Sequence, residues 1–105
     1  MSLSAEFEKL NRLVQELIGL LDEAEETFWR RYLARGIQNV AEHKLAGATF
    51  ILGCYAGEGS FSDLQLAPEL EDTDPLRHRN LNARLSKLRT EVFKSAGRIA
   101  SRELW

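Results

Sequence analysis

Apolar residues recur at three- and four-residue steps through most of this chain, and this spacing constrains its fold more than any other feature. Such steps place apolar side chains in one stripe along an α-helix, whereas a half-buried strand would require strict alternation. The pattern predicts helices at about residues 4–22, 25–43, 45–55 and 75–103, and no strand. We therefore expect an all-α fold, a four-helix bundle that forms a single domain over residues 4–105.

The third predicted helix, residues 45–55, differs from the others because it is apolar on nearly every side. A helix of that kind is normally enclosed by other helices, so we expect it at the centre of the core. The inward face of the second helix is expected to hold Phe28, Trp29, Tyr32, Leu33, Ile37 and Val40. Helical spacing further predicts one buried cluster, made of Trp29, Leu33, Phe50, Leu52, Leu85, Leu88 and Val92.

Turn residues interrupt the helical pattern after Tyr55, where two glycines lie close together. Glycine takes a positive φ at little cost, so we expect it at Gly57 or Gly59 and a sharp reversal of the chain there. Phe61 would then point into the core, and Asp63 or Ser60 would hydrogen-bond the freed backbone amides. The predicted structural turn therefore comprises Gly57, Gly59, Ser60, Phe61 and Asp63.

An acidic connection follows this Gly-rich turn, and residues 56–74 as a whole are predicted to form a loop between the third and fourth helices. Its second half is rich in Glu and Asp and is bounded by Pro68 and Pro75. Such a composition favours solvated, irregular structure. Asp74 and Pro75 are well suited to be the N-cap and the first position of the last helix.

Charge is distributed unevenly between the two parts of the chain. Residues 1–75 contain 6 Lys/Arg and 14 Asp/Glu, whereas residues 76–105 contain 8 and 2. Five cations fall on one flank of the last helix and form what we call the basic ridge: Arg84, Lys87, Lys94, Arg98 and Arg102. A ridge of this kind can meet nucleic-acid phosphates. The alternative is that it faces the acidic residues of the first two helices or is simply exposed to solvent, and the net charge of −2 argues against nucleic-acid binding.

No catalytic or metal-binding spacing is present in the sequence. Cys54 is the only cysteine, so no disulfide can form within the chain, and its apolar neighbours predict a buried thiol. His43 and His78 are not related to it by any known catalytic spacing. We therefore expect a non-enzymatic protein without a cofactor or metal ion.

The longest weakly polar stretch, residues 45–57, is shorter than the ~20 residues that a membrane-spanning helix needs. A basic-then-apolar secretory leader is also absent, so the expected location is the cytoplasm, without contact to a membrane.

The turn also resembles the hallmark of a family of small uncharacterised bacterial proteins, Tyr-Gly-Gly-Met-Gly-Ser-Phe-Asn-Asp-Leu after a short apolar helix. The resemblance covers about residues 28–93, and the chain departs from the hallmark at Ala56, Glu58 and Ser62. It implies a helical fold and a bacterial origin but no activity. Proteins of this type are sometimes encoded near contact-dependent toxins, which implies an immunity role. The matching residues are Trp29, Leu33, the Lys44-to-Gly47 corner, Tyr55, Gly57, Gly59, Ser60, Phe61, Asp63 and Leu64.

These observations favour a small protein-interaction module, including a toxin-neutralising protein, whose partner is another protein. The alternative is a nucleic-acid-associated regulator that uses the basic ridge. The oligomeric state stays open, and a homodimer is compatible with the sequence. Candidate partner-binding residues lie in the glycine turn and along the last helix: Glu58, Arg84, Lys87, Phe93, Lys94 and Arg98.

Overall fold

The protein is folded almost entirely into α-helices. The computed structural model describes residues 2–56 and 59–103, and no strand occurs among them, which confirms the all-α prediction. The elements in chain order are α1 (Leu3–Glu23), α2 (Thr27–Ala41), α3 (Leu45–Gly53), the 3-10 turn η1 (Phe61–Asp63), α4 (Leu70–Thr73) and α5 (Pro75–Glu103).

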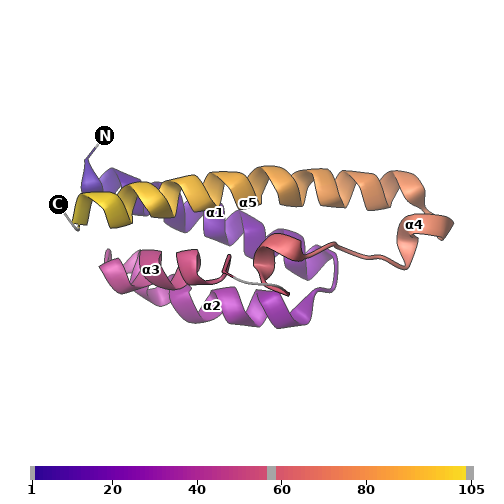
Figure 1. Ribbon diagram of the computed structural model, residues 1–105, viewed down its shortest axis with the longest axis horizontal. Helices are drawn as coiled ribbons and strands as arrows, with labels where there is room; N and C mark the ends of the chain where they lie inside the picture. Colours follow the sequence, from indigo (N-terminus) through magenta and orange to yellow (C-terminus); the bar gives the residue numbers. More distant parts are fainter. Residues whose placement is uncertain (1, 57–58, 104–105) are drawn as a thin grey trace.

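The four longer helices surround one core in an elongated molecule of 48 × 25 × 19 Å. α1 and α5 run side by side in opposite directions, so the first turn of α1 and the last turn of α5 lie at the same end (Figure 1). α1 also packs against α2, and α3 packs against both α2 and α5. α3 therefore lies diagonally across the core from α1.

α1 contributes more buried side chains than any other helix in the described residues. Its stripe contains seven buried apolar residues, and six of them are at most 1% exposed. Burying each such side chain stabilises the fold by about 1.5–3 kcal/mol relative to leaving it in water. α5 faces this stripe with its own apolar residues, so the α1–α5 pair forms most of the core. The α1 residues are Phe7, Leu10, Leu13, Val14, Leu17, Leu20 and Leu21.

The prediction that residues 45–55 lie at the centre of the core is wrong. Within α3 only Gly47, Ala48 and Ile51 are buried, and Cys54 follows them directly. The opposite side of the helix is exposed and consists of small residues, Ala46, Thr49 and Gly53. This helix contains no charged residue, and an enclosed position was predicted for it on that ground. It lies instead at the edge of the fold, where small side chains expose little apolar area.

The predicted buried cluster is correct for only part of its members. Leu33, Leu85 and Val92 are fully buried, with at most 1% exposure. Four others pack against the core from its edge and are only partly buried: Trp29, Phe50, Leu52 and Leu88. Helical spacing identifies the inward side of a helix, but it does not tell which neighbours cover the two flanks.

Three helix boundaries have clear local causes. The Ser2 hydroxyl accepts a hydrogen bond from the Ala5 amide at 3.1 Å and so caps α1, ahead of residue 4, where the domain was predicted to begin. Asp74 caps α5 in the same way through the Arg77 amide at 3.2 Å, directly before Pro75. α1 ends with Glu25 in the left-handed conformation, at a φ of 58°.

The predicted loop over residues 56–74 contains two short helical elements, η1 and α4. α4 begins just after Pro68, and its single turn closes with a hydrogen bond from the Asp74 amide to the Leu70 carbonyl at 2.8 Å. Acidic residues in the first turn suit the positive end of a helix dipole. The same acidic composition that predicted a solvated loop therefore also fits a one-turn helix.

Candidate functional site

Seven aromatic rings form a connected network on the α2–α3 half of the molecule. From Phe28 the rings follow one another across the α2–α3 seam and over the chain that follows α3, with centroids 4.9–6.0 Å apart. Such tilted and stacked pairs stabilise each other beyond the area they bury. We call this the aromatic network: Phe28, Trp29, Tyr32, Phe50, Tyr55, Phe61 and Phe93.

The two ends of the aromatic network are open to solvent. Phe28 is 63% exposed and Phe93 is 46% exposed, whereas Phe61 in the middle is fully buried. The prediction that Phe28 lies on the inward face of its helix is therefore wrong. Its ring lies on the flank of α2 and touches Tyr32 and Trp29 at the start of the helix. Phe93 packs on Tyr55 at 4.9 Å and keeps its other side exposed.

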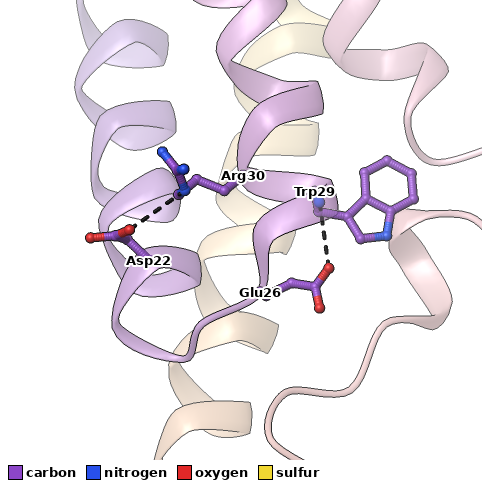
Figure 2. A network of polar contacts seen from close by, with 4 residues as sticks. All are labelled: Asp22, Glu26, Trp29 and Arg30. Atoms are coloured by element: carbon purple, nitrogen blue, oxygen red, sulfur yellow. Dashed lines mark hydrogen bonds and ion pairs between the residues drawn. The ribbon is translucent and has the colours of Figure 1, made fainter.

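The joint between α1 and α2 orients Trp29. The Glu26 carboxylate accepts a hydrogen bond from the Trp29 amide at 3.4 Å and so caps α2. One residue further on, the Arg30 guanidinium lies 3.5 Å from the Asp22 carboxylate at the end of α1. Figure 2 shows the Trp29 ring pointing away from this joint, toward the chain that follows α3. There it contacts Phe61 at a centroid distance of 5.3 Å.

Two glycines allow α2 and α3 to approach each other closely. A side-chain carbon at Gly36 would lie 2.5 Å from the Phe50 ring, and one at Gly47 would lie 2.6 Å from the Val40 backbone nitrogen. Phe50 therefore packs directly over the α2 backbone and stacks on Tyr32 at 5.3 Å. Gly36 therefore marks a close crossing of the two helices.

The glycine turn has the features that its sequence predicts, as far as the described residues extend. Gly59 has a φ of 70°, Phe61 is buried, and the Asp63 carboxylate accepts a hydrogen bond from the Gly59 amide at 3.0 Å. The Ser60 hydroxyl donates to the Tyr55 carbonyl at 3.3 Å, which satisfies a carbonyl that the end of α3 leaves unpaired. Gly57 and Glu58 lie outside the described residues.

Two polar side chains of α5 hold the chain that follows this turn. Arg89 donates two hydrogen bonds from one guanidinium nitrogen, to the Phe61 carbonyl at 3.0 Å and to the Leu64 carbonyl at 3.1 Å. The Asn82 amide pairs with both backbone groups of Leu66, at 2.8 and 3.0 Å. Neither Arg89 nor Asn82 was among the predicted site residues. Their seven-residue spacing, which places them on one side of α5, was the only signal for them.

A small cleft opens where the aromatic network meets α5. It has a volume of about 240 Å³ and is walled by the Tyr55 and Phe93 rings. The Tyr55 hydroxyl donates to the Arg89 carbonyl at 2.7 Å, which fixes one wall. Burial raises the pKa of this hydroxyl far above its usual range, so it remains a donor. We call this the Phe93 cleft, lined by Tyr55, Ser62, Arg89, Thr90, Phe93 and Lys94.

Two cations of the basic ridge form ion pairs with carboxylates of α1. Arg84 lies 3.0 Å from the Glu23 carboxylate, and Arg98 lies 3.4 Å from the buried Glu6 carboxylate. Lys87 lines an open groove of about 430 Å³ between α1 and α5. Lys94 differs because it also borders the Phe93 cleft, and Arg102 lies in the last turn of α5. The ridge therefore meets acidic groups of α1 at two points.

The groups with catalytic potential lie apart. Cys54 is 3% exposed, and burial raises the pKa of its thiol to about 11, so the reactive thiolate is disfavoured at neutral pH. The His43 ring stacks on Phe7 at 5.2 Å, just before the start of α3, whereas Cys54 directly follows the end of that helix. Within the described part of the chain, no group of three or more His, Cys, Asp or Glu could hold a metal ion. Nor does any helix there have the length and apolar character to cross a membrane.

Comparison with known proteins identified one similarity. A family model described as a domain of unknown function (DUF6966) matches residues 22–73, just under half of the chain. The matched segment runs from the end of α1 to the end of α4 and includes every ring of the aromatic network except Phe93. No curated protein and no solved structure matches the chain significantly. The chain is thus similar to an uncharacterised family, whereas the ten-residue hallmark and the bacterial origin stay predictions.

Proposed function

We propose that this protein is a non-enzymatic interaction module that binds another protein through its aromatic network. The observation that carries the proposal is the exposure of the rings at both ends of the network, 63% at Phe28 and 46% at Phe93. Aromatic residues and arginine are among the types most enriched where proteins bind one another, and an aromatic ring buries a large area with only about two rotatable bonds.

The surroundings of the network support this use. Two inner rings of the network are held in place before any partner arrives, Phe50 over Gly36 and Tyr55 by its hydroxyl bond, so these two would lose little side-chain freedom on binding. The Arg35 guanidinium lies 5.4 Å from the Tyr32 ring centroid and adds a cation at the edge. The outer side of α3 is uncharged, so covering it would desolvate no ion.

Two other classes of function have less support. The raised pKa of Cys54 and the stacking of His43 on Phe7 leave both side chains poorly suited to nucleophilic catalysis. A nucleic-acid-associated role for the basic ridge would require Arg84 and Arg98 to exchange their carboxylate partners on α1 for phosphates.

A narrower form of the proposal is a bacterial immunity protein that neutralises a toxin. It is motivated by the family that the turn resembles. It predicts a toxin reading frame directly upstream of the gene, and that expression of this chain restores the growth of cells that produce the toxin. Growth arrest that this chain leaves unchanged would remove the immunity role and leave the interaction role in place.

The test compares variants of equally exposed apolar residues. The tagged chain and its Phe28→Ala and Phe93→Ala variants are used to capture partners from an extract of the native host, followed by mass spectrometry. Leu76→Ala is the matched control, because Leu76 is also 63% exposed but lies at the start of α5, away from the network. All three side chains are exposed, so the variants should fold, and their helical circular dichroism checks this.

We expect one protein to be retained by the parent and by Leu76→Ala, and to be lost or weakened at least tenfold with either ring removed, which corresponds to ~1.4 kcal/mol of binding free energy. A partner that is lost only with Leu76→Ala would move the binding surface to α5. Specific retention of duplex DNA or RNA at physiological salt, abolished by charge reversal at Arg98, would favour the nucleic-acid alternative.

A further inference from the structure

The Phe93 cleft is sized for a single side chain. Its volume of about 240 Å³ is below the range of about 300–1,000 Å³ in which pockets for whole small molecules fall. Two of its walls are the rings of Tyr55 and Phe93, with centroids 4.9 Å apart and planes tilted by 41°. The two rings pack on each other, so an apolar side chain in the cleft would lie against both of them and contact ring carbons of each.

The cleft is also rigid at its base. The Tyr55 hydroxyl is bonded to the Arg89 carbonyl, and the Arg89 guanidinium is bonded to the carbonyls of Phe61 and Leu64. These bonds tie α3, the chain after the glycine turn and α5 together at one point. A preformed pocket loses little freedom when it is filled, which favours binding of an anchor residue there.

The rim of the cleft carries positive charge that the described residues do not neutralise. Lys94 and Arg89 both line it, and none of the ion pairs among the described residues involves either of them. Arg89 bonds only neutral carbonyl oxygens in this region. Residues 76–105 contain 8 Lys/Arg and only 2 Asp/Glu, so the helix that supplies this part of the rim has an excess of positive charge.

We propose that the Phe93 cleft binds an apolar side chain that lies next to a carboxylate in an acidic segment of the partner protein. The apolar side chain lies in the cleft against the Tyr55 and Phe93 rings, and the carboxylate pairs with Lys94 at the rim. This inference rests on the proposed function, since it names the chemistry that a protein partner presents to one end of the aromatic network.

The smallest probe with this chemistry is N-acetyl-phenylalanine, which has one aromatic side chain and one carboxylate. It is titrated into the ¹⁵N-labelled full chain, and the backbone amide shifts are compared with those caused by N-acetyl-phenylalanine amide, which lacks the charge. We expect shifts around residues 55, 62 and 89–94 with a Kd of about 1 mM or weaker. The neutral probe should bind roughly fivefold more weakly, the factor that one exposed ion pair contributes.

Three variants test the two halves of the proposal separately. Phe93→Ala should abolish binding of both probes, because it removes one wall. Lys94→Gln should remove the preference for the carboxylate and leave the neutral probe unaffected. Lys87→Gln is the matched control, since Lys87 lies seven residues earlier on the same helix but outside the cleft. It should bind both probes as the parent does.

Equal affinity for the two probes, or shifts that map to Phe28 instead of the cleft, would overturn the inference. So would an absence of shifts at tens of millimolar probe. These results are distinct from a failure of the proposed function. A partner whose capture depends on Phe28 but not on Phe93 or Lys94 would leave the interaction role intact and remove the cleft from it.

Discussion

The α1–α5 pair and the α2–α3 pair share one core but are built in different ways. α1 and α5 are long helices, of 21 and 29 residues, that meet through aliphatic side chains and are joined by ion pairs near both ends, Arg84 with Glu23 and Arg98 with Glu6. α2 and α3 are shorter, and they meet through glycines and aromatic rings. The first pair provides most of the buried aliphatic surface, while most of the aromatic network lies on the second and only Phe93 comes from α5.

Stability therefore depends mainly on the enclosed aliphatic side chains, whereas the proposed recognition depends on exposed rings, including Phe93 of α5. Removing a side chain from the α1 stripe empties a fully enclosed site, whereas removing an exposed ring changes the surface and little else. Substitutions of exposed rings can therefore change binding to a partner without much effect on folding. Five sets of substitutions test this division, and they are ordered by the size of the expected effect.

The largest effect is expected from Leu17→Ala in α1. Leu17 is fully buried, so its truncation should lower the free energy of unfolding by about 3 to 5 kcal/mol, as enclosed leucines do. Phe50→Ala in α3 should cost less, about 2 kcal/mol, because its ring is only partly buried. Urea denaturation of both variants measures the difference. A greater loss from Phe50→Ala would make α3 the centre of the core after all.

A methyl group added at the α2–α3 crossing should lower the stability of the protein, whereas one added on α1 should raise it. Gly47→Ala would place a carbon 2.6 Å from the Val40 backbone nitrogen, which cannot move aside, and should cost about 2 kcal/mol. Gly19→Ala is the control: nothing lies within 4 Å of the new carbon, and alanine should stabilise α1 by up to ~1 kcal/mol. The melting temperature should fall in Gly47→Ala and rise in Gly19→Ala. Two stabilised variants would contradict the close crossing.

The Asn82 side chain should matter although it is polar and only half-buried. Asn82→Ala leaves the amide and carbonyl of Leu66 without partners, at an expected cost of about 2 kcal/mol. Asn80→Ala, at an exposed position of the same helix, should change stability by less than about 0.5 kcal/mol. Hydrogen exchange of the Leu66 amide should accelerate in the first variant alone. Unchanged exchange would show that the bond is not needed to order this chain.

A smaller loss is expected in the glycine turn. Gly59→Ala forces a side chain into the left-handed conformation, at a φ of 70°, which costs about 1 kcal/mol. Nothing lies within 4 Å of the added carbon, so the cost is conformational and not steric. Gly59→Asn should recover part of it, because asparagine tolerates this conformation. A fully stable alanine variant, measured by urea denaturation, would refute the turn geometry.

The smallest effect is expected from Arg84→Gln, which removes an ion pair whose side chains are both about half exposed. Such pairs contribute about 0.5 kcal/mol, and salt weakens them. The difference from the parent should therefore disappear in about 0.5 M NaCl, where charges are screened within a few ångströms. A loss that persists at high salt would mean that the Arg84 stem packs against α1 in a way that the ion pair alone does not explain.

The sequence predicts the parts of the fold whose information is local and repeated. The stripes of α1 and α5 extend over many turns, and the Asp74–Pro75 pair marks the start of α5 through contacts within one turn. The turn at Gly59 and Asp63 is equally local, since the bond that closes it spans four residues. Each of these features depends on neighbours in the chain, which is why periodicity and capping chemistry identify them.

The remaining features depend on residues far apart in the chain. Arg89 and Asn82 form hydrogen bonds with backbone groups 16 to 28 residues away, and no local sequence pattern predicts such a bond. The exposure of Phe28 and of the outer side of α3 follows from where the other helices end. An uncharged helix can be enclosed or can lie at an edge with small residues outward, and its composition alone does not distinguish the two.

The bonds from Asn82 and Arg89 also have a consequence for the order of events during synthesis. Both residues follow the chain that they hold, so on the ribosome Phe61, Leu64 and Leu66 emerge before the groups that will secure them. Phe61 therefore takes its final position beneath the rings of α2 and α3 only after the last helix has been synthesised. A nascent chain arrested after residue 73 would contain the whole family-matched segment and still lack its finished surface.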